Sequence, residues 1–187
     1  MKIFDLPLET DRLILRRVRH DDFDDLFPIH SDPEVCRYLP YEPRDEAAMK
    51  EAIEKRVALV EMTPGGEPLF LAVELKETGE VIGEVLLFYH HEEWRQGELG
   101  YVFSPKFHGK GYAYEATRAF MDAAFDQFNL HRISARCSAA NIASWRLMEK
   151  LKMRREGDFR EHEIFKGEWD HMYIYAILED EWRAHRS

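Results

Sequence analysis

The sequence predicts a mixed α/β fold, in which helices lie on the faces of a central sheet. Strand-like and helix-like runs follow one another in the order β-α-α-β-β-β-α-β-α-β-β. In the helical run at residues 112–128, alanines gather on one side and allow the helix to lie close to a sheet. Turn-forming residues at 76–80 and 166–167 separate strand-like runs and predict two hairpins.

The N-terminal part of the chain is expected to hold one strand and two helical segments. An apolar run at residues 13–18 predicts the first strand. His20-Asp21-Asp22 supplies capping side chains for a helix over residues 23–29. Asp32-Pro33-Glu34 then starts a short helical turn that ends near residues 39–40.

A longer helix follows, because apolar residues recur with helical spacing. Separations of four, four and three residues place Met49, Ile53, Val57 and Val60 on one face. Pro64-Gly65-Gly66 is expected to end this helix.

The centre of the chain is rich in strand signals. Residues 69–75 and 81–89 are strand-like, and the loop at 76–80 between them makes them a hairpin. A further strand is expected at 97–103, after a polar loop. Residues 132–135 form a short strand after the helix at 112–128.

The C-terminal part repeats the pattern of helix and hairpin. Asn141 opens a helix that ends near residues 151–152, and strands are expected at 155–165 and 168–178. Residues 179–187 form a charged tail, which we expect to be frayed.

Length and composition indicate one globular domain. The chain has 187 residues, 45% hydrophobic and 33% charged, so we expect a single domain over residues 1–187 with its core at about 8–178. The net charge of −10 argues against a general nucleic-acid binder, which needs a basic face. It suits a cationic substrate, and simple solubility explains it equally well.

The chain shows no signal for secretion or for a membrane. Two cysteines, Cys36 and Cys137, do not make a disulfide framework. The acidic N-terminus has no long apolar run, so we expect no signal peptide, and no stretch is apolar enough to span a membrane. A cytoplasmic protein is expected.

The hexapeptide His108-Gly109-Lys110-Gly111-Tyr112-Ala113 has the character of a phosphate-binding loop. It lies between a predicted strand and a predicted helix, whose first N–H groups are free to point at an anion. Gly111 follows Lys110 where an ATP loop needs Ser or Thr, and Tyr114 stands where the dinucleotide motif needs its third glycine. The shorter pattern (Gln/Arg)-x-x-Gly-x-(Gly/Ala) fits at every position but the first. An ordinary glycine-rich turn before a helix is compatible with the hexapeptide taken alone.

Four segments, in order along the chain, resemble the GCN5-related N-acetyltransferases, in particular the ribosomal-protein (RimJ/RimL-like) branch. The segments are Leu8-Glu9-Thr10-Asp11-Arg12-Leu13-Ile14-Leu15-Arg16, Gly97-Glu98-Leu99-Gly100-Tyr101-Val102-Phe103, the hexapeptide extended by Glu115-Ala116, and Asn141-Ile142-Ala143-Ser144 with the helix that follows. Together the match covers the chain from about Leu8 to Leu178.

The resemblance implies a fold, a co-substrate and an activity. The fold is a central mixed, mostly antiparallel sheet flanked by helices, and the co-substrate is acetyl-CoA. The activity is transfer of the acetyl group to a primary amine by direct attack on the thioester, with a protein N-terminus as one acceptor. A polyamine, antibiotic or amino-acid acceptor is the alternative within enzymes, and a non-catalytic acyl-CoA sensor is the alternative outside them. Members of this branch often form dimers, so a homodimer is implied.

The resemblance also implies which residues hold acetyl-CoA. The main chain around His108, Gly109, Lys110, Gly111, Tyr112 and Ala113 would hold the pyrophosphate. Tyr101, Val102 and Phe103 would align the pantetheine arm, although a buried strand explains them equally well. Asn141 would hydrogen-bond a pantetheine amide, and its alternative role is a helix N-cap.

Candidates for the proton transfers are carboxylates and a hydroxyl. Ser144 is the candidate proton donor to the thiolate, and its alternative is a hydroxyl bonded to the backbone. Glu98 is the candidate general base, acting directly or through water, with Glu84 on the neighbouring strand as the second candidate. Each of these carboxylates is also explained as a solvated strand residue. No metal is expected, because His90 and His91 are adjacent on a strand and point to opposite faces.

Two positions depart from the family pattern. His108 replaces Gln or Arg at the head of the loop, and can still donate to phosphate. Leu151-Lys152-Met153 replaces Leu-Gly-Phe after the late helix, so Lys152 takes a helix-ending position that glycine fills at little cost.

Overall fold

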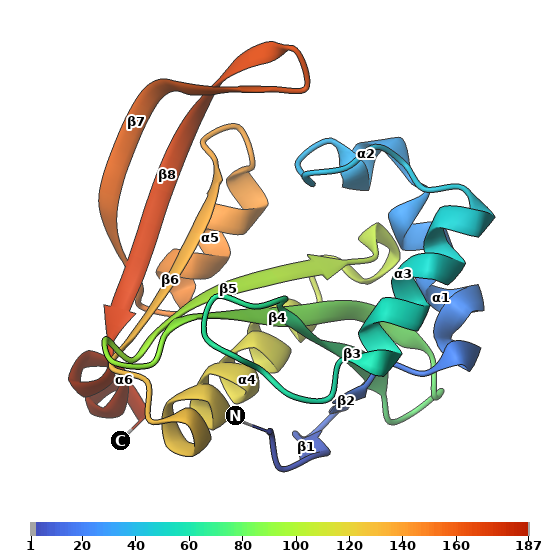
Figure 1. Ribbon diagram of the computed structural model, residues 1–187, viewed down its shortest axis with the longest axis horizontal. Coiled ribbons are helices and arrows are strands. Elements are labelled where there is room, and N and C mark those ends of the chain that lie inside the picture. Colours follow the sequence, from blue (N-terminus) through green and yellow to red (C-terminus); the bar gives the residue numbers. More distant parts are fainter. Residues whose placement is uncertain (1–2, 187) are drawn as a thin grey trace.

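The computed structural model describes residues 3–186 and contains one eight-stranded sheet in the order β1-β2-β3-β4-β5-β6-β8-β7 (Figure 1). The strands are β1 (Leu8–Glu9), β2 (Leu13–Arg17), β3 (Leu69–Leu75), β4 (Val81–His91), β5 (Gln96–Phe103), β6 (Arg132–Ser138), β7 (Arg154–Phe165) and β8 (Glu168–Leu178). The helices are α1 (Phe23–His30), α2 (Pro33–Cys36), α3 (Glu46–Ala58), α4 (Tyr112–Phe128), α5 (Ile142–Lys150) and α6 (Glu179–Arg186), with short 3-10 turns η1 (His20–Asp22) and η2 (Pro105–Phe107). All neighbouring strands are antiparallel except β5 and β6, which confirms the predicted mixed, mostly antiparallel sheet flanked by helices.

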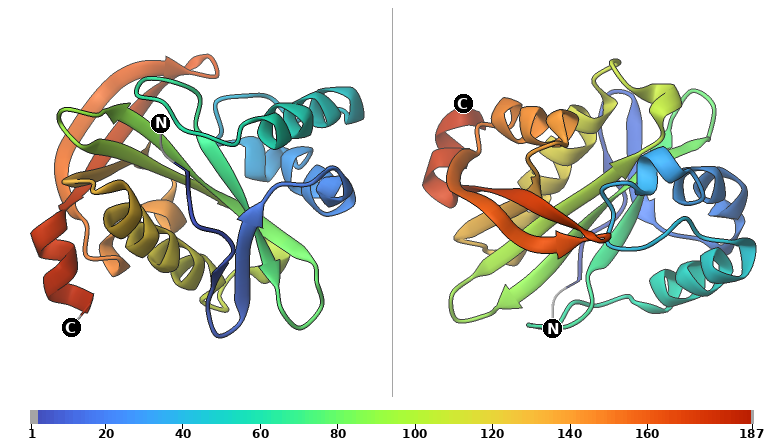
Figure 2. Two further views of the ribbon diagram at one scale, coloured as in Figure 1. Left: turned by 60° about the horizontal axis from the view of Figure 1, so that its bottom comes forward. Right: turned by 90° about the horizontal axis from the view of Figure 1, so that it is seen from above.

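Helices cover both faces of the sheet, as Figure 2 shows. Helices α1 and α3 pack on one face, where Leu26 and Ile53 join Val102 of β5 in a small buried cluster. Helices α4 and α5 lie on the other face, where Phe120 and Met148 belong to the larger core. We call these the α3 face and the α4 face. Because side chains alternate along a strand, each residue of β5 belongs to one face or the other.

The parallel strands β5 and β6 separate after a short contact. They pair only from Gln96 to Glu98 on β5 and from Arg132 to Ser134 on β6. Beyond this point β5 continues with β4 and β6 continues with β8, so the two strands diverge (Figure 1). The sheet therefore opens between its two central strands.

The C-terminal segment differs from the expected frayed tail. It forms the helix α6, in which Trp182 is buried and donates from Nε1 to Asp122 Oδ1 on α4 at 2.8 Å. Arg186 adds ion pairs to Asp122 and Asp126. The prediction was wrong because one aromatic side chain and paired charges fix this segment against α4, and the core extends beyond residue 178.

Two smaller expectations also need correction. The strand β1 was missed, because two residues are too few to show any periodicity. Val60 is 46% exposed and lies after the end of α3, so it does not belong to the buried face of that helix. Met49 and Ile53 are buried there as expected.

The end of α5 shows how a lysine replaces the family's glycine. Lys152 adopts the left-handed conformation with a φ of 65°. The N–H of Met153 donates to the carbonyl of Met148 and the N–H of Lys152 to that of Glu149, which is the bonding of a Schellman motif. Met148 and Met153 are both buried, so their packing holds this helix end in place.

Candidate active site

The loop between β5 and α4 has an open backbone. Gly109 and Gly111 take φ values of 76° and 83°, in the left-handed region that favours glycine. A β-carbon on Gly109 would meet no atom within 4 Å. Within residues 3–186, the backbone N–H groups from Gly109 to Ala113 donate no hydrogen bond to another protein group. This stretch, together with the N-terminus of α4, therefore presents unpaired donors that suit a pyrophosphate.

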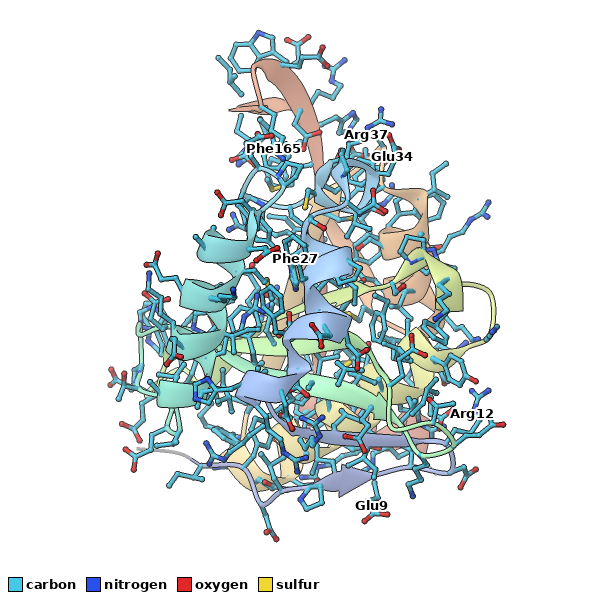
Figure 3. The ribbon with its side chains drawn as sticks, turned by 90° about the vertical axis from the view of Figure 1, so that its right-hand side faces the viewer. Glu9, Arg12, Phe27, Glu34, Arg37 and Phe165 are labelled. Carbon is cyan, nitrogen blue, oxygen red and sulfur yellow. The ribbon has the colours of Figure 1, made fainter. Side chains whose placement is uncertain are left out.

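Residues in the turn between β1 and β2 hold this loop through hydrogen bonds. Arg12 donates from Nε to Glu115 Oε2 at 2.7 Å and from Nη1 to the carbonyl of Lys110 at 3.2 Å. Thr10 donates from its hydroxyl to Glu115 Oε1 at 2.7 Å. The Arg12 guanidinium also lies 4.4 Å from the centre of the Tyr112 ring. Figure 3 shows Arg12 at the right-hand edge of the molecule.

Glu115 is the anchor of this contact. Burial alone would raise its pKa, but hydrogen bonds from Thr10 and Arg12 outweigh burial and hold the pKa below its usual value. Glu115 is therefore ionised at neutral pH and fixes Arg12 beside the loop. Glu115 also stands in the first turn of α4, where the helix dipole favours a carboxylate. Its partners come from a segment about 100 residues away in the chain.

His108, the departure from the family pattern, points back into the protein. Its Nε2 lies 3.3 Å from the carbonyl oxygen of Phe103, the last residue of β5. The side chain therefore links the end of the strand to the start of the loop.

The opening between β5 and β6 leaves one edge of β5 without a strand partner. From Leu99 to Phe103 this edge pairs with no strand in residues 3–186, so its backbone groups can pair with an extended amide-containing chain. Tyr101, Val102 and Phe103 lie in this part of the strand. Val102 and Phe103 are buried, and the alternative of a buried strand holds at the same time.

Asn141 serves as the N-cap of α5. Its Oδ1 accepts from the N–H of Ser144 at 3.2 Å. Its amide nitrogen has no acceptor among the described residues, so that nitrogen is available to an amide carbonyl of a ligand. The cap and a ligand contact use different atoms and are compatible.

Three polar side chains gather beside the opening. The hydroxyl of Tyr101 lies 3.0 Å from the hydroxyl of Ser144 and 3.0 Å from its carbonyl oxygen. Burial raises the pKa of Tyr101, and the hydrogen bond with Ser144 opposes this rise. Burial also raises the pKa of the neighbouring Cys137 thiol to about 11. From the sequence, Tyr101 was expected to contribute through its main chain. The contact between its side chain and Ser144 was not predicted.

The two candidate bases occupy different surroundings on the α3 face. Glu98 lies at the last paired position before the opening, where Arg136 Nε is 3.1 Å from Oε1 and His90 Nε2 is 3.2 Å from Oε2. Glu84 has no exposed area and lies between His30 Nε2 at 2.8 Å and Arg56 Nη1 at 3.0 Å. Glu84 is therefore neither a solvated carboxylate nor able to touch a substrate directly.

A segment around α2 is hydrogen-bonded to the β7–β8 turn and to the residue before Asn141. Lys166, in the β7–β8 turn, donates to the carbonyls of Cys36 and Tyr41 at 2.9 and 2.8 Å. Tyr38 donates to the carbonyl of Ala140, just before α5. Figure 3 labels Phe165 of the same hairpin and Arg37 and Glu34 of the α2 region in the upper part of the view. We call residues 36–41 the strap.

The described residues offer few signs of other chemistry. Within residues 3–186, no three His, Cys, Asp or Glu side chains are grouped to bind a metal ion. None of the helices in the same range has the length and apolar character needed to cross a membrane.

Comparison with known proteins identifies the family. Residues 12–154 match the model of the acetyltransferase (GNAT) domain. The chain is 37% identical over 177 residues to the uncharacterized N-acetyltransferase YnaD of Bacillus subtilis (strain 168), covering 95% of this chain and 99% of the relative. It is 27% identical over 185 residues to the [ribosomal protein uS5]-alanine N-acetyltransferase of Escherichia coli (strain K12), covering 96% and 94%.

A solved structure agrees with these matches. The crystal structure of a GNAT-family acetyltransferase from Bacillus anthracis superposes with a TM-score of 0.84 at 32% identity, covering 94% of this chain and 100% of that one. The parted central strands and the loop at the start of α4 lie inside the matched regions. The protein is an N-acetyltransferase and belongs to the GNAT family.

Proposed function

We propose that this enzyme transfers the acetyl group of acetyl-CoA to a primary amine, by direct attack of the amine on the thioester. The observation that best supports the proposal is the unpaired edge of β5, which leads directly to a loop with unpaired N–H groups. An extended pantetheine arm and a pyrophosphate need these two features in this order.

The residues divide into those that bind and those that move protons. The N–H groups of Gly109, Lys110, Gly111, Tyr112 and Ala113 would hold the pyrophosphate, and His108 would join the loop to the end of β5. Tyr101, Val102 and Phe103 would align the arm through their main chain, and the amide nitrogen of Asn141 would donate to it. These contacts would position the thioester near the point where β5 and β6 part.

Glu98 is the proposed acceptor of the proton that the amine loses, directly or through water. It lies beside the parting of the strands and remains 21% exposed, whereas Glu84 is sealed in the interior. Ser144 is proposed to interact with the departing sulfur. In the balanced reaction the amine gains an acetyl group and loses a proton, and the free thiol of CoA is the second product.

The acceptor that we propose is a protein N-terminal amine, with a small-molecule amine as the alternative. The similarity to the ribosomal-protein uS5-alanine acetyltransferase supports the first. The strap, which is bridged to Ala140 and to Lys166, favours a narrow acceptor, either an extended chain end or a small amine. The family pattern also supports a cytoplasmic location and a homodimer. Light scattering on the purified protein would test whether it is a dimer.

The test is release of free CoA thiol in the presence of a panel of amines. The panel holds peptides with ribosomal-protein N-termini, polyamines, amino acids and aminoglycosides, and mass spectrometry identifies each product. Preference for peptides supports the first acceptor class, and preference for a small amine supports the second. Tight binding of acetyl-CoA in titration calorimetry, without any acetylated product across the panel, would contradict the proposed transfer.

A further inference from the structure

Two hydroxyl groups meet beside the opening of the sheet. Tyr101 lies on the α4 face of β5, and its hydroxyl reaches Ser144 in the first turn of α5. The Tyr101 oxygen is 3.0 Å from both the hydroxyl and the carbonyl oxygen of Ser144. The Tyr101 ring packs against the large core. The contact therefore links the edge of β5 to the helix that Asn141 caps.

The contact restricts what the Ser144 hydroxyl can do. A serine in the first turns of a helix commonly turns its hydroxyl toward a nearby backbone group. The Tyr101 hydroxyl carries one proton and lies at the same distance from the carbonyl oxygen and the hydroxyl oxygen of Ser144. When that proton is shared between these two acceptors, the Ser144 proton is available to another acceptor. The Cys137 thiol is the other side chain that hydrogen-bonds Ser144, and a thiol is a weaker partner than a phenol hydroxyl. Tyr101 is therefore the stronger of the two side chains that orient the Ser144 hydroxyl.

The acidities of the groups show which task the pair can perform. Burial raises the pKa of Tyr101, so its hydroxyl keeps its proton over the whole working range. An ordinary thiol has a pKa of about 8.5, below that of a phenol at about 10. A thiolate therefore gains no proton from this pair at equilibrium. It gains hydrogen bonds, which stabilise its negative charge.

We propose that Tyr101 is a positioning residue, which orients the Ser144 hydroxyl so that it donates a hydrogen bond to the departing CoA thiolate. The inference rests on the proposed function and adds to it a role for the Tyr101 side chain. It also replaces proton donation by Ser144 with stabilisation of charge. The proton that the sulfur finally takes is then the one lost by the amine, passed through solvent.

The chain contains a matched control for this contact. Tyr175 on β8 is buried as well, and its hydroxyl donates to Glu149 Oε1 at 3.1 Å. Burial and Glu149 raise the pKa of Tyr175 to about 12. Tyr175→Phe therefore removes a buried hydroxyl that contacts the same helix without touching Ser144.

The decisive measurement is the pKa of the thiol of bound CoA. Ultraviolet absorbance of the thiolate is followed against pH in the complex, with the complex of desulfo-CoA as the blank to remove the signal of Cys137. We expect Tyr101→Phe and Ser144→Ala each to raise this thiol pKa by about one unit, and the double variant to raise it no further. Tyr175→Phe should leave it unchanged.

Turnover and affinity provide the second comparison. We expect Tyr101→Phe to lower kcat about tenfold while the Kd for acetyl-CoA stays within about twofold, because the hydrogen bond strengthens as charge develops. Circular dichroism and thermal unfolding check that each variant is folded.

Three results would overturn the proposal. If the pKa of the bound CoA thiol is unchanged in folded Tyr101→Phe, the contact between Tyr101 and Ser144 does not stabilise the thiolate. Additive effects of Tyr101→Phe and Ser144→Ala show that the two residues act independently. If Tyr175→Phe and Tyr101→Phe change the thiol pKa equally, both effects come from the general loss of a buried hydroxyl and not from a role of Tyr101 in orienting Ser144. Failure of the parent protein to bind CoA would instead contradict the proposed function itself, so the two failures are distinguishable.

Discussion

Replacement of Gly111 by aspartate would place a carboxylate at the proposed pyrophosphate site. Gly111 has a φ of 83° and a ψ of 0° at the N-cap of α4. Any β-carbon in this left-handed conformation costs about 1–2 kcal/mol, and Asn and Asp tolerate it best. The added β-carbon would meet only Arg12 Nη2, at 3.6 Å, so there is space for the side chain. Gly111→Asn is therefore a control with the same size and the same backbone cost.

The difference between the two variants is a single negative charge. Two unit charges about 5 Å apart repel by about 3 kcal/mol at an effective dielectric constant of about 20. The Arg12 guanidinium lies close enough to attract the new carboxylate and so to offset part of the repulsion. Because Arg12 is already paired with Glu115, we take this attraction as about 1 kcal/mol. The remaining 2 kcal/mol, roughly, corresponds to about 30-fold weaker binding of acetyl-CoA to Gly111→Asp than to Gly111→Asn.

Titration calorimetry measures both affinities, and thermal unfolding verifies that the two variants have equal stability. The difference in acetyl-CoA affinity between the two variants should become smaller at high ionic strength, because the charge lies near the surface and salt screens it. Equal affinities for acetyl-CoA in the two folded variants would refute the assignment of the loop to the pyrophosphate.

Three further predictions concern single residues. Glu98→Gln should lower kcat/KM by about 10²-fold or more without changing the Kd for acetyl-CoA, and unaltered turnover would remove Glu98 from the chemistry. Glu115→Gln should lower the free energy of unfolding by about 1–2 kcal/mol at pH 7, because Arg12 and Thr10 lose an ionised partner. Since the pKa of Glu115 is lowered on folding, its contribution is complete above the unfolded value of about 4.3 and disappears as pH falls through the lowered pKa. Urea unfolding at several pH values should therefore show the two proteins converging in acid, and a constant difference would contradict this reasoning. Lys152→Gly should raise the free energy of unfolding by about 1 kcal/mol, because φ is 65° there, whereas Lys152→Ala should bring no such gain.

Local patterns predicted the parts of the site that are built from neighbouring residues. The strand at 97–103, the loop at 108–113 and the start of α4 are continuous in the chain, so turn chemistry and periodicity were sufficient to place them. The cap formed by Asn141 is likewise local. The family match adds that residues 12–154, which contain these elements, form an acetyltransferase (GNAT) domain.

Contacts between distant segments could not be predicted in the same way. Arg12 and Glu115 are 103 residues apart, and neither position shows in the sequence which partner it will meet. The side chain of Tyr101 meets Ser144 only because β5 and α5 are brought together by the sheet. Glu84 looks like any strand carboxylate until His30 and Arg56 are placed beside it. Trp182 is one apolar residue in a charged segment, which gives no periodic signal.

Both ends of the described chain pack on α4, the helix that follows the proposed pyrophosphate loop. Phe4 contacts the rings of Phe120 and Phe128, and Trp182 stacks near Phe125. During synthesis on the ribosome, α4 therefore emerges well before its last supporting residue. Its packing is completed only after Trp182 has left the exit tunnel, because contacts between distant residues form after loop closure. The helix next to the proposed pyrophosphate loop is thus fully packed only after the segment at residues 179–186 has been made and has folded back onto it.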